Sequence, residues 1–144
     1  MSGLLTLRQL RVEARDREQQ AFARRLSELR LAEELLRRAS ARWESHGGWV
    51  HQRAAARLSA LSSEAAAIAV LHARHEHRLR SELEVLAFGR DVARRELATR
   101  SSLRDEARDA LKRAEASLAV LERLLERRAE EAQRRSTRRA DEAR

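Results

Sequence analysis

The sequence feature that most constrains the fold is a long apolar repeat in a chain without proline. From Leu58 through Leu61 and Ala65 to Leu125, a stripe of mostly apolar residues recurs at largely alternating steps of three and four, and none of the 144 residues is proline. Five positions of the stripe are polar or charged, namely His72, His75, Arg90, Arg100 and Arg104. Residues with this spacing form one stripe along an α-helix, and the stripe is buried only when another helix packs against it. The sequence therefore predicts long helices that pack side by side.

A second repeat occupies the N-terminal third of the chain. Phe22, Leu29, Leu36 and Trp43 follow one another every seven residues, which is the period of a coiled-coil seam. We therefore predict a first helix over residues 4–45, with a seam that faces a second helix.

Composition favours helices over strands. Hydrophobic residues make up 42% of the chain but aromatic residues only 3%, and the apolar set is mostly leucine and alanine, which are strong helix formers. The β-branched and aromatic residues that strands favour are scarce. The predicted fold is all-α, a long antiparallel α-helical coiled-coil hairpin that forms a single domain over residues 1–144. Residues 136–144 are predicted as a frayed tail, because the leucine repeat ends before them.

The pair Gly47–Gly48 is the strongest signal for a break between the helices. Glycine readily adopts the left-handed conformation that ends many helices. We predict a turn over residues 46–49 and a second helix over residues 50–140. The only two tryptophans, Trp43 and Trp49, flank this turn. They are interpreted either as seam residues that seal the end of the helix pair or as an exposed anchor for a partner, since tryptophan is enriched at binding hot spots.

Gly89 leaves the path of the second helix open. The helix is either continuous, kinked or broken near this residue, and the lack of a neighbouring proline or second glycine favours a continuous or kinked helix. With a turn at 46–49, the first helix is only about 60 Å long, so the leucines at 111–125 lie beyond its reach. Either the second helix folds back, or this stripe is reserved for another protein.

No catalytic or cofactor-binding arrangement is predicted. The chain has no cysteine or tyrosine and no glycine-rich loop for phosphates. The nearest approach to a metal site is "HARHEH", in which His72 and His75 share a helix face and His77 points away. Zinc-binding histidine pairs on helices favour a spacing of four and need a further ligand, so we interpret His72 and His75 as seam residues. We predict no enzymatic activity, metal, cofactor or small-molecule substrate.

The net charge of +8 comes almost entirely from arginine, because Lys112 is the only lysine. An excess of basic residues is typical of proteins that bind nucleic acid, an acidic membrane surface or an acidic protein. Single-strand binders combine cations with stacking aromatics, which are scarce here, and residues 126–144 mix seven arginines with five acids. The pattern disfavours nucleic acid and favours a solvated helix face that can dock an acidic partner. Because no apolar run approaches the ~20 residues of a membrane span, we also predict a cytoplasmic protein without a transmembrane segment.

The stretch 118–135, "LAVLERLLERRAEEAQRR", followed by "STRRADE", resembles the C-terminal signature of the FliJ/YscO family. Members of that family are small coiled-coil stalk proteins of flagellar and injectisome type III secretion. The opening "LLTLRQLRVEARDREQQAFARRLSELRLAEELL" is similar to the first helix of the family, and a glycine-containing break about fifty residues into the chain is also shared. The resemblance spans most of the sequence.

The resemblance implies a non-enzymatic stalk or adaptor that engages a hexameric export ATPase and an export-gate membrane protein, and that escorts secretion chaperones. It implies a cytoplasmic location, peripheral to the inner membrane. The end that carries both chain termini would face the ATPase, and the opposite tip, with Trp43 and Trp49, would face the gate protein. The residues expected at the ATPase end are Arg8, Arg11, Arg127, Arg128, Arg134, Arg135 and Arg138.

Three other classes of protein remain open at this point. The first is a generic coiled-coil scaffold or adaptor outside secretion, which could pair through residues 111–125. The second, less well supported, is an arginine-rich helical protein that binds nucleic acid. A peripheral membrane helix ranks last, because the apolar stripe is narrow and coiled-coil-like. The sequence leaves open whether the secretion system would be flagellar or an injectisome.

Overall fold

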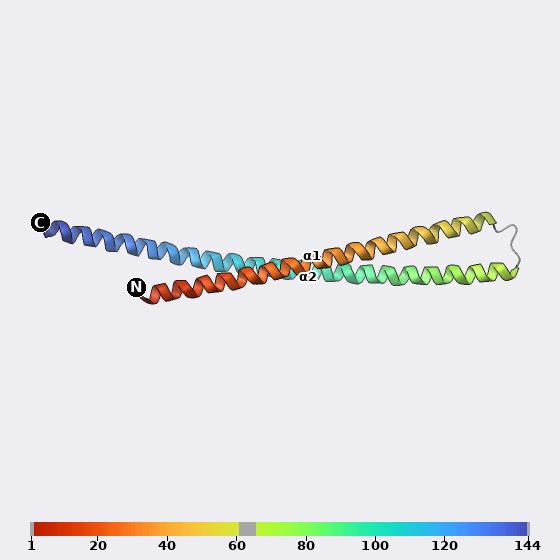
Figure 1. Ribbon diagram of the computed structural model, residues 1–144, viewed down its shortest axis with the longest axis horizontal. Helices are drawn as coiled ribbons and strands as arrows, with labels where there is room; N and C mark the ends of the chain where they lie inside the picture. Colours follow the sequence, from red (N-terminus) through yellow and green to blue (C-terminus); the bar gives the residue numbers. More distant parts are fainter. Residues whose placement is uncertain (1, 61–65, 144) are drawn as a thin grey trace. The chain divides into compact units, whose positions relative to one another are not determined.

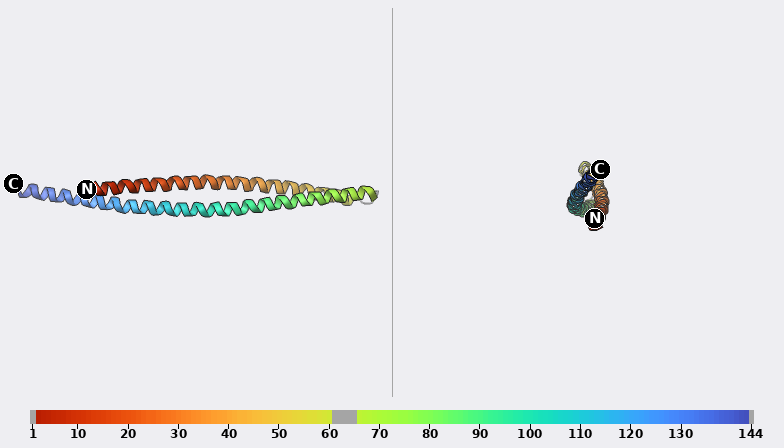
Figure 2. Two further views of the ribbon diagram at one scale, coloured as in Figure 1. Left: turned by 90° about the horizontal axis from the view of Figure 1, so that it is seen from below. Right: turned by 90° about the vertical axis from the view of Figure 1, so that its left-hand side faces the viewer.

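The computed structural model describes residues 2–60 and 66–143, which form two α-helices (Figure 1). Helix α1 spans Ser2–Ala60 and helix α2 spans Ala66–Glu142. The helices run in opposite directions and pack against each other, and no strand occurs among the described residues (Figures 1 and 2). The predicted all-α antiparallel hairpin is confirmed.

The turn predicted at residues 46–49 is wrong, because α1 continues through both glycines. These four residues are helical, α1 ends at Ala60, and no described glycine has a positive φ angle. The second helix begins at Ala66 rather than at residue 50, and the first begins at Ser2 rather than at residue 4. The predicted seam positions Leu61 and Ala65 lie outside the described residues.

Packing against α2 explains why the glycine pair stays helical. The seam of α1 runs on through it, since Trp43, His46 and Val50 are all half-buried. Gly47 itself faces α2, where an added Cβ atom would lie 3.6 Å from Leu83 Cδ1. An interior glycine costs about 1 kcal/mol relative to alanine, and burial of the apolar seam on both sides offsets that cost. Glycine therefore weakens the helix here without ending it.

Helix α2 is uninterrupted at Gly89, so the alternative with three helices is wrong. It also reaches Glu142, and the backbone N–H of Ala143 donates to the carbonyl oxygen of Arg139 at 3.2 Å. Residues 136–142, predicted as part of a frayed tail, are thus helical, while Arg144 lies outside the described residues.

Segments of both helices form two compact units. The terminal unit comprises Met1–Ser27 and Ser102–Arg144, and the inner unit comprises Glu28–Ser101. In the terminal unit, Leu118 and Leu121 are buried, and Nη2 of Arg8 lies 3.4 Å from Oε1 of Glu122. The start of α1 therefore covers the leucine stripe at 111–125, whose partner the sequence leaves open. Because α1 is longer than predicted, the stripe can be covered within the hairpin.

The inner unit has a thin apolar core reinforced by an ion pair. Among the described residues of this unit, the buried side chains are Leu29, Ala32 and Leu79. Nη1 of Arg57 lies 2.7 Å from Oε2 of Glu76, and both side chains are only 20% exposed. Since Arg57 is on α1 and Glu76 is on α2, this pair connects the two helices.

Candidate partner-binding surfaces

The terminal unit contains a stretch of α2 that has no helix beside it. Every residue from 126 to 143 is exposed, whereas Leu121 just before this stretch is buried. In Figures 1 and 2, α2 continues beyond the N-terminal end of α1. We call residues 126–142 the C-terminal overhang. A helix that is exposed on all sides is held by its own hydrogen bonds and side-chain pairs rather than by a core.

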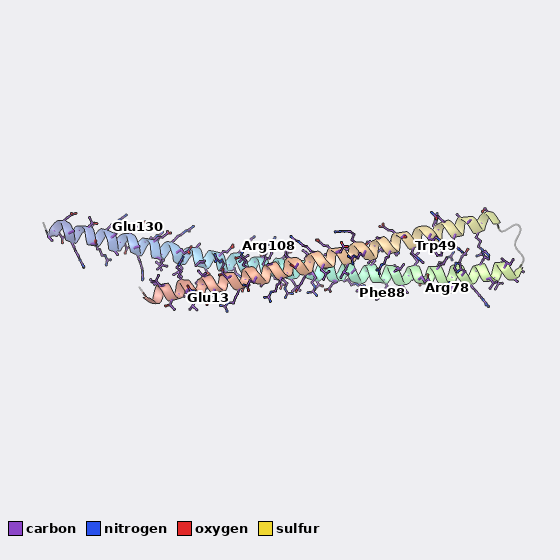
Figure 3. All side chains as sticks on the ribbon, viewed as in Figure 1. Glu13, Trp49, Arg78, Phe88, Arg108 and Glu130 are labelled. Carbon is purple, nitrogen blue, oxygen red and sulfur yellow. The ribbon has the colours of Figure 1, made fainter. Side chains whose placement is uncertain are left out.

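The overhang carries five of the arginines predicted to bind a partner. They are Arg127, Arg128, Arg134, Arg135 and Arg138, all exposed. The side chains around Glu130 project away from the helix in Figure 3. Among the described residues, the one ion pair within the overhang joins Arg135 to Glu131 at 4.0 Å. The other four guanidinium groups are accessible to acidic groups outside the chain.

The two predicted arginines of the first helix lie in the same unit. Arg8 and Arg11 are both exposed. The guanidinium of Arg8 is paired with Glu122 on α2, whereas Arg11 has no ion pair among the residues that the structure describes. The terminal unit thus combines all seven predicted arginines with both chain ends.

Trp43 is half-buried within α1, far along the sequence from the end of the helix at Ala60. The guanidinium carbon of Arg90 on α2 lies 4.0 Å from the centre of its ring. A cation over an aromatic face is stabilising, and more so when both groups are shielded from water. Trp43 is therefore a packing residue of the inner unit, and its predicted place beside a turn is wrong.

Trp49 belongs to α1 as well, but it is 43% exposed. Its ring meets the ring of His75 edge-on, with centroids 6.4 Å apart, and Arg53 covers it at 5.0 Å. Its predicted place beside a turn is wrong for the same reason as for Trp43. Trp49 keeps part of its indole surface accessible from outside the hairpin.

Trp49 lines a shallow groove between the two helices. One hollow is lined by Arg42, His46 and Trp49, and an adjoining hollow by His46 and Val85, with Leu86 common to both. We call these five residues the apolar groove. The Nε2–H of His46 donates to the carbonyl oxygen of Leu79 at 3.0 Å, which orients the ring within the groove.

Sequence reasoning missed the apolar ridge beside this groove. Val85, Phe88 and Val92 are 70%, 66% and 46% exposed, and their spacing of three and four places them on one face of α2. Leu31 and Leu35, four residues apart on α1, are also exposed at 62% and 50%. The spacing of Val85, Phe88 and Val92 outside the main seam is the signal that could have revealed this surface.

Arg100 on α2 links to α1 within the inner unit. Its guanidinium contacts Glu96 at 2.6 Å and Glu28 of α1 at 3.1 Å. The hydrogen bond and charge of Glu96 raise the pKa of Arg100, burial opposes that rise, and Glu28 adds to it. A raised pKa means that these contacts favour the charged form of the Arg100 guanidinium.

Burial differs between the two histidines predicted to lie in the seam. His75 is half-buried against Trp49, as the seam interpretation predicts, but His72 is exposed, so that interpretation is wrong for His72. No group of three or more His, Cys, Asp or Glu side chains within the described ranges could hold a metal ion. Within the same ranges, neither helix contains a stretch apolar and long enough to cross a membrane.

Comparison of the chain with protein-family models, with curated proteins and with solved structures found no match. Among the described residues, the C-terminal overhang and the apolar groove with its ridge are candidate surfaces for contact with a partner. Both are suited to contact other macromolecules, because each is open and neither forms an enclosed cavity for a small substrate.

Proposed function

We propose that this chain is a non-enzymatic stalk or adaptor component of a type III secretion export apparatus. In this role it engages a hexameric export ATPase through its terminal unit and an export-gate membrane protein through its inner unit. The proposal starts from the resemblance of residues 118–135 and of the opening helix to the FliJ/YscO family. The paired long helices support it, since a stalk connects partners at different points along its length and needs no catalytic centre of its own.

The observation that carries the proposal is the C-terminal overhang. Six arginines and two glutamates lie between residues 127 and 139, on a helix that no other part of the described chain covers. Exposed arginines favour carboxylates as partners, because the guanidinium can donate two parallel hydrogen bonds to one carboxylate. A bare, cationic helix end is a suitable shape for insertion into an acidic opening of a protein ring.

The apolar groove and its ridge supply a second contact for the proposed role. Trp49 is a good anchor, since a partly exposed indole offers a large apolar surface at low cost in conformational entropy. On this proposal the gate protein contacts Trp49 and the exposed Val85 and Phe88 beside it. Trp43, which is packed beneath Arg90, contributes to stability rather than to contact.

A scaffold outside secretion is the second candidate function. The exposed ridge at Val85, Phe88 and Val92 favours it, because such a ridge would pack against a helix of any suitable partner. In that case the apolar groove binds a partner and the overhang contributes little.

Co-sedimentation with the export ATPase of the same cell tests the proposed function. The full chain is compared with a chain truncated after Glu126, which lacks the overhang arginines, and with Trp49→Ala, which leaves the overhang intact. We expect the full chain and Trp49→Ala to co-sediment with the ATPase and the truncated chain to remain in the supernatant. Equal binding by all three would contradict the proposed role of the overhang, and no binding by any would favour the scaffold.

A further inference from the structure

One face of α2 in the terminal unit changes from apolar to cationic along its length. Val120, Leu124, Arg127, Glu131, Arg134 and Arg138 follow one another at steps of four and three, which places them in one line along the helix. Val120 and Leu124 are 66% and 42% exposed, and the other four are exposed as well. We call these six residues the bipartite stripe.

The apolar half of the stripe is widened by α1. Leu7 and Leu10 are 39% and 52% exposed. They lie at the level of Val120 and Leu124, because Arg8 of α1 contacts Glu122 of α2. Exposed leucines and valine at one level of a two-helix unit leave an apolar surface that a third helix could cover.

The cationic half is free to bind carboxylates. The side chains of Arg127, Arg134 and Arg138 make no ion pair or hydrogen bond with any other described residue. The one acid in the stripe, Glu131, lies 4.0 Å from Arg135, whose guanidinium partly balances its charge. The three stripe arginines therefore form no salt bridge among the described residues, and they lie on the same line as the apolar half.

We propose that the bipartite stripe binds a single amphipathic α-helix of a partner protein, whose contact face is apolar at one end and carboxylate-rich at the other. The stripe covers 18 steps of 1.5 Å, or roughly 27 Å, which is the length of one ordinary helix of about five turns. Steps of three and four are the spacing at which two helices interlock. The inference rests on the proposed function, since it specifies the kind of ATPase helix that the terminal unit engages.

The charge pattern favours a helix over a polyanion. Nucleic acid would gain nothing from the exposed apolar side chains of Val120 and Leu124. An apolar contact also excludes water beside the arginines, which strengthens the neighbouring ion pairs. The two halves therefore act together only for a partner that carries both chemistries in one segment.

The probe for this inference is a synthetic helical peptide of about three heptads with leucine in one half of its seam and glutamate in the other. A second peptide of the same design carries lysine in place of the glutamates. Binding to the full chain is measured by fluorescence anisotropy. We expect the glutamate peptide to bind and the lysine peptide to bind at least about tenfold more weakly, given like-charge repulsion at three arginines.

Matched variants separate the stripe from general charge attraction. In the test variant, Arg127, Arg134 and Arg138 are replaced by glutamate, and in the control variant Lys112, Arg123 and Arg139 are replaced by glutamate. Both carry the same change in net charge, but the control residues are exposed cations of α2 that lie outside the stripe. A third variant, Val120→Ser with Leu124→Ser, removes the apolar half. Circular dichroism checks that all variants remain helical.

We expect the test variant and the serine variant each to weaken binding about tenfold or more, and the control variant less than about threefold. Equal losses in the two glutamate variants would overturn the inference, because the arginines would then act only as a diffuse cationic surface. Tighter binding of anionic lipid vesicles than of the glutamate peptide would also overturn it. Co-sedimentation with the ATPase tests the proposed function independently, since the chain can bind the ATPase through other contacts even if the peptide does not bind.

Discussion

Trp43 and Trp49 are six residues apart on α1, yet their surroundings assign them different roles. Trp43 is half-buried and stacks under Arg90, whereas Trp49 keeps 43% of its surface exposed at the apolar groove. The sequence allowed both a packing role and an anchoring role for the pair. The structure separates the two roles because the seam of α1 passes directly through Trp43 and leaves Trp49 at its edge.

Replacement of the two tryptophans is expected to give unequal losses of stability. We expect Trp43→Ala to lower the free energy of unfolding by about 2 kcal/mol, since a half-buried aromatic side chain is lost, and Trp49→Ala by about 1 kcal/mol or less. Urea unfolding followed by circular dichroism measures both values. A larger loss for Trp49→Ala than for Trp43→Ala would contradict the assignment of Trp43 as the packing residue.

The shielded pair Arg57–Glu76 is expected to matter more than exposed pairs on a single helix. The Arg57 side chain is only 20% exposed, and in Glu76→Ala it would lose its carboxylate partner and keep only a 3.5 Å hydrogen bond to the carbonyl oxygen of Ala69. We expect the free energy of unfolding to fall by about 1–3 kcal/mol. The matched control is Glu34→Ala, which removes two exposed pairs with Arg37 and Arg38 within α1 and should cost under about 1 kcal/mol. Equal effects in thermal unfolding would show that the cross-helix pair is not shielded in solution.

At the scale of the elements, the seven-residue repeats were sufficient to predict two long antiparallel helices, but not where the first one ends. Gly47 and Gly48 are the strongest local break in the sequence, and local preference was outweighed by the seam that continues through Val50. A hairpin turning at Gly47 would also have left the stripe at 111–125 uncovered, and the longer α1 resolves that conflict. The spacing of apolar residues beyond a glycine pair is thus more informative than the pair itself.

Alanine at the helical glycines should stabilise the protein. An added Cβ meets nothing within 4 Å at Gly48 or Gly89 and only an ordinary contact with Leu83 at Gly47. We expect Gly48→Ala and Gly89→Ala each to raise the free energy of unfolding by about 0.5–1 kcal/mol, because alanine loses less backbone entropy in a helix. Chemical denaturation measures the change. If Gly48 instead formed a left-handed turn, Gly48→Ala would destabilise the protein while Gly89→Ala still stabilised it.

At the scale of the whole molecule, only five apolar side chains among the described residues are buried, and two surfaces are open to partners. The arginines near both termini could be singled out from the sequence, and the structure places all seven in one unit. The exposed ridge at Val85 and Phe88 was not predicted, because both residues lie outside the main seam, on the outer face of α2. The extent of the overhang could not be predicted either, since it depends on how the two helices align.

Removal of the overhang should leave the rest of the hairpin intact. Residues 127–143 are all exposed, so truncation after Glu126 removes no core packing among the described residues. We expect the melting temperature to change by less than about 2 °C, as for loss of surface residues that carry only weak ion pairs. A drop several times larger would mean that the overhang packs against another part of the chain.

Steady-state ATP hydrolysis by the export ATPase, measured while this protein is titrated in, tests the central claim most directly. The proposed stalk should stimulate hydrolysis in a saturable way, and the stimulation should be lost when the chain is truncated after Glu126. It should also weaken with added salt, because the contacts of exposed arginines are screened. A full chain that is helical by circular dichroism but leaves hydrolysis unchanged at saturating concentration would contradict the account.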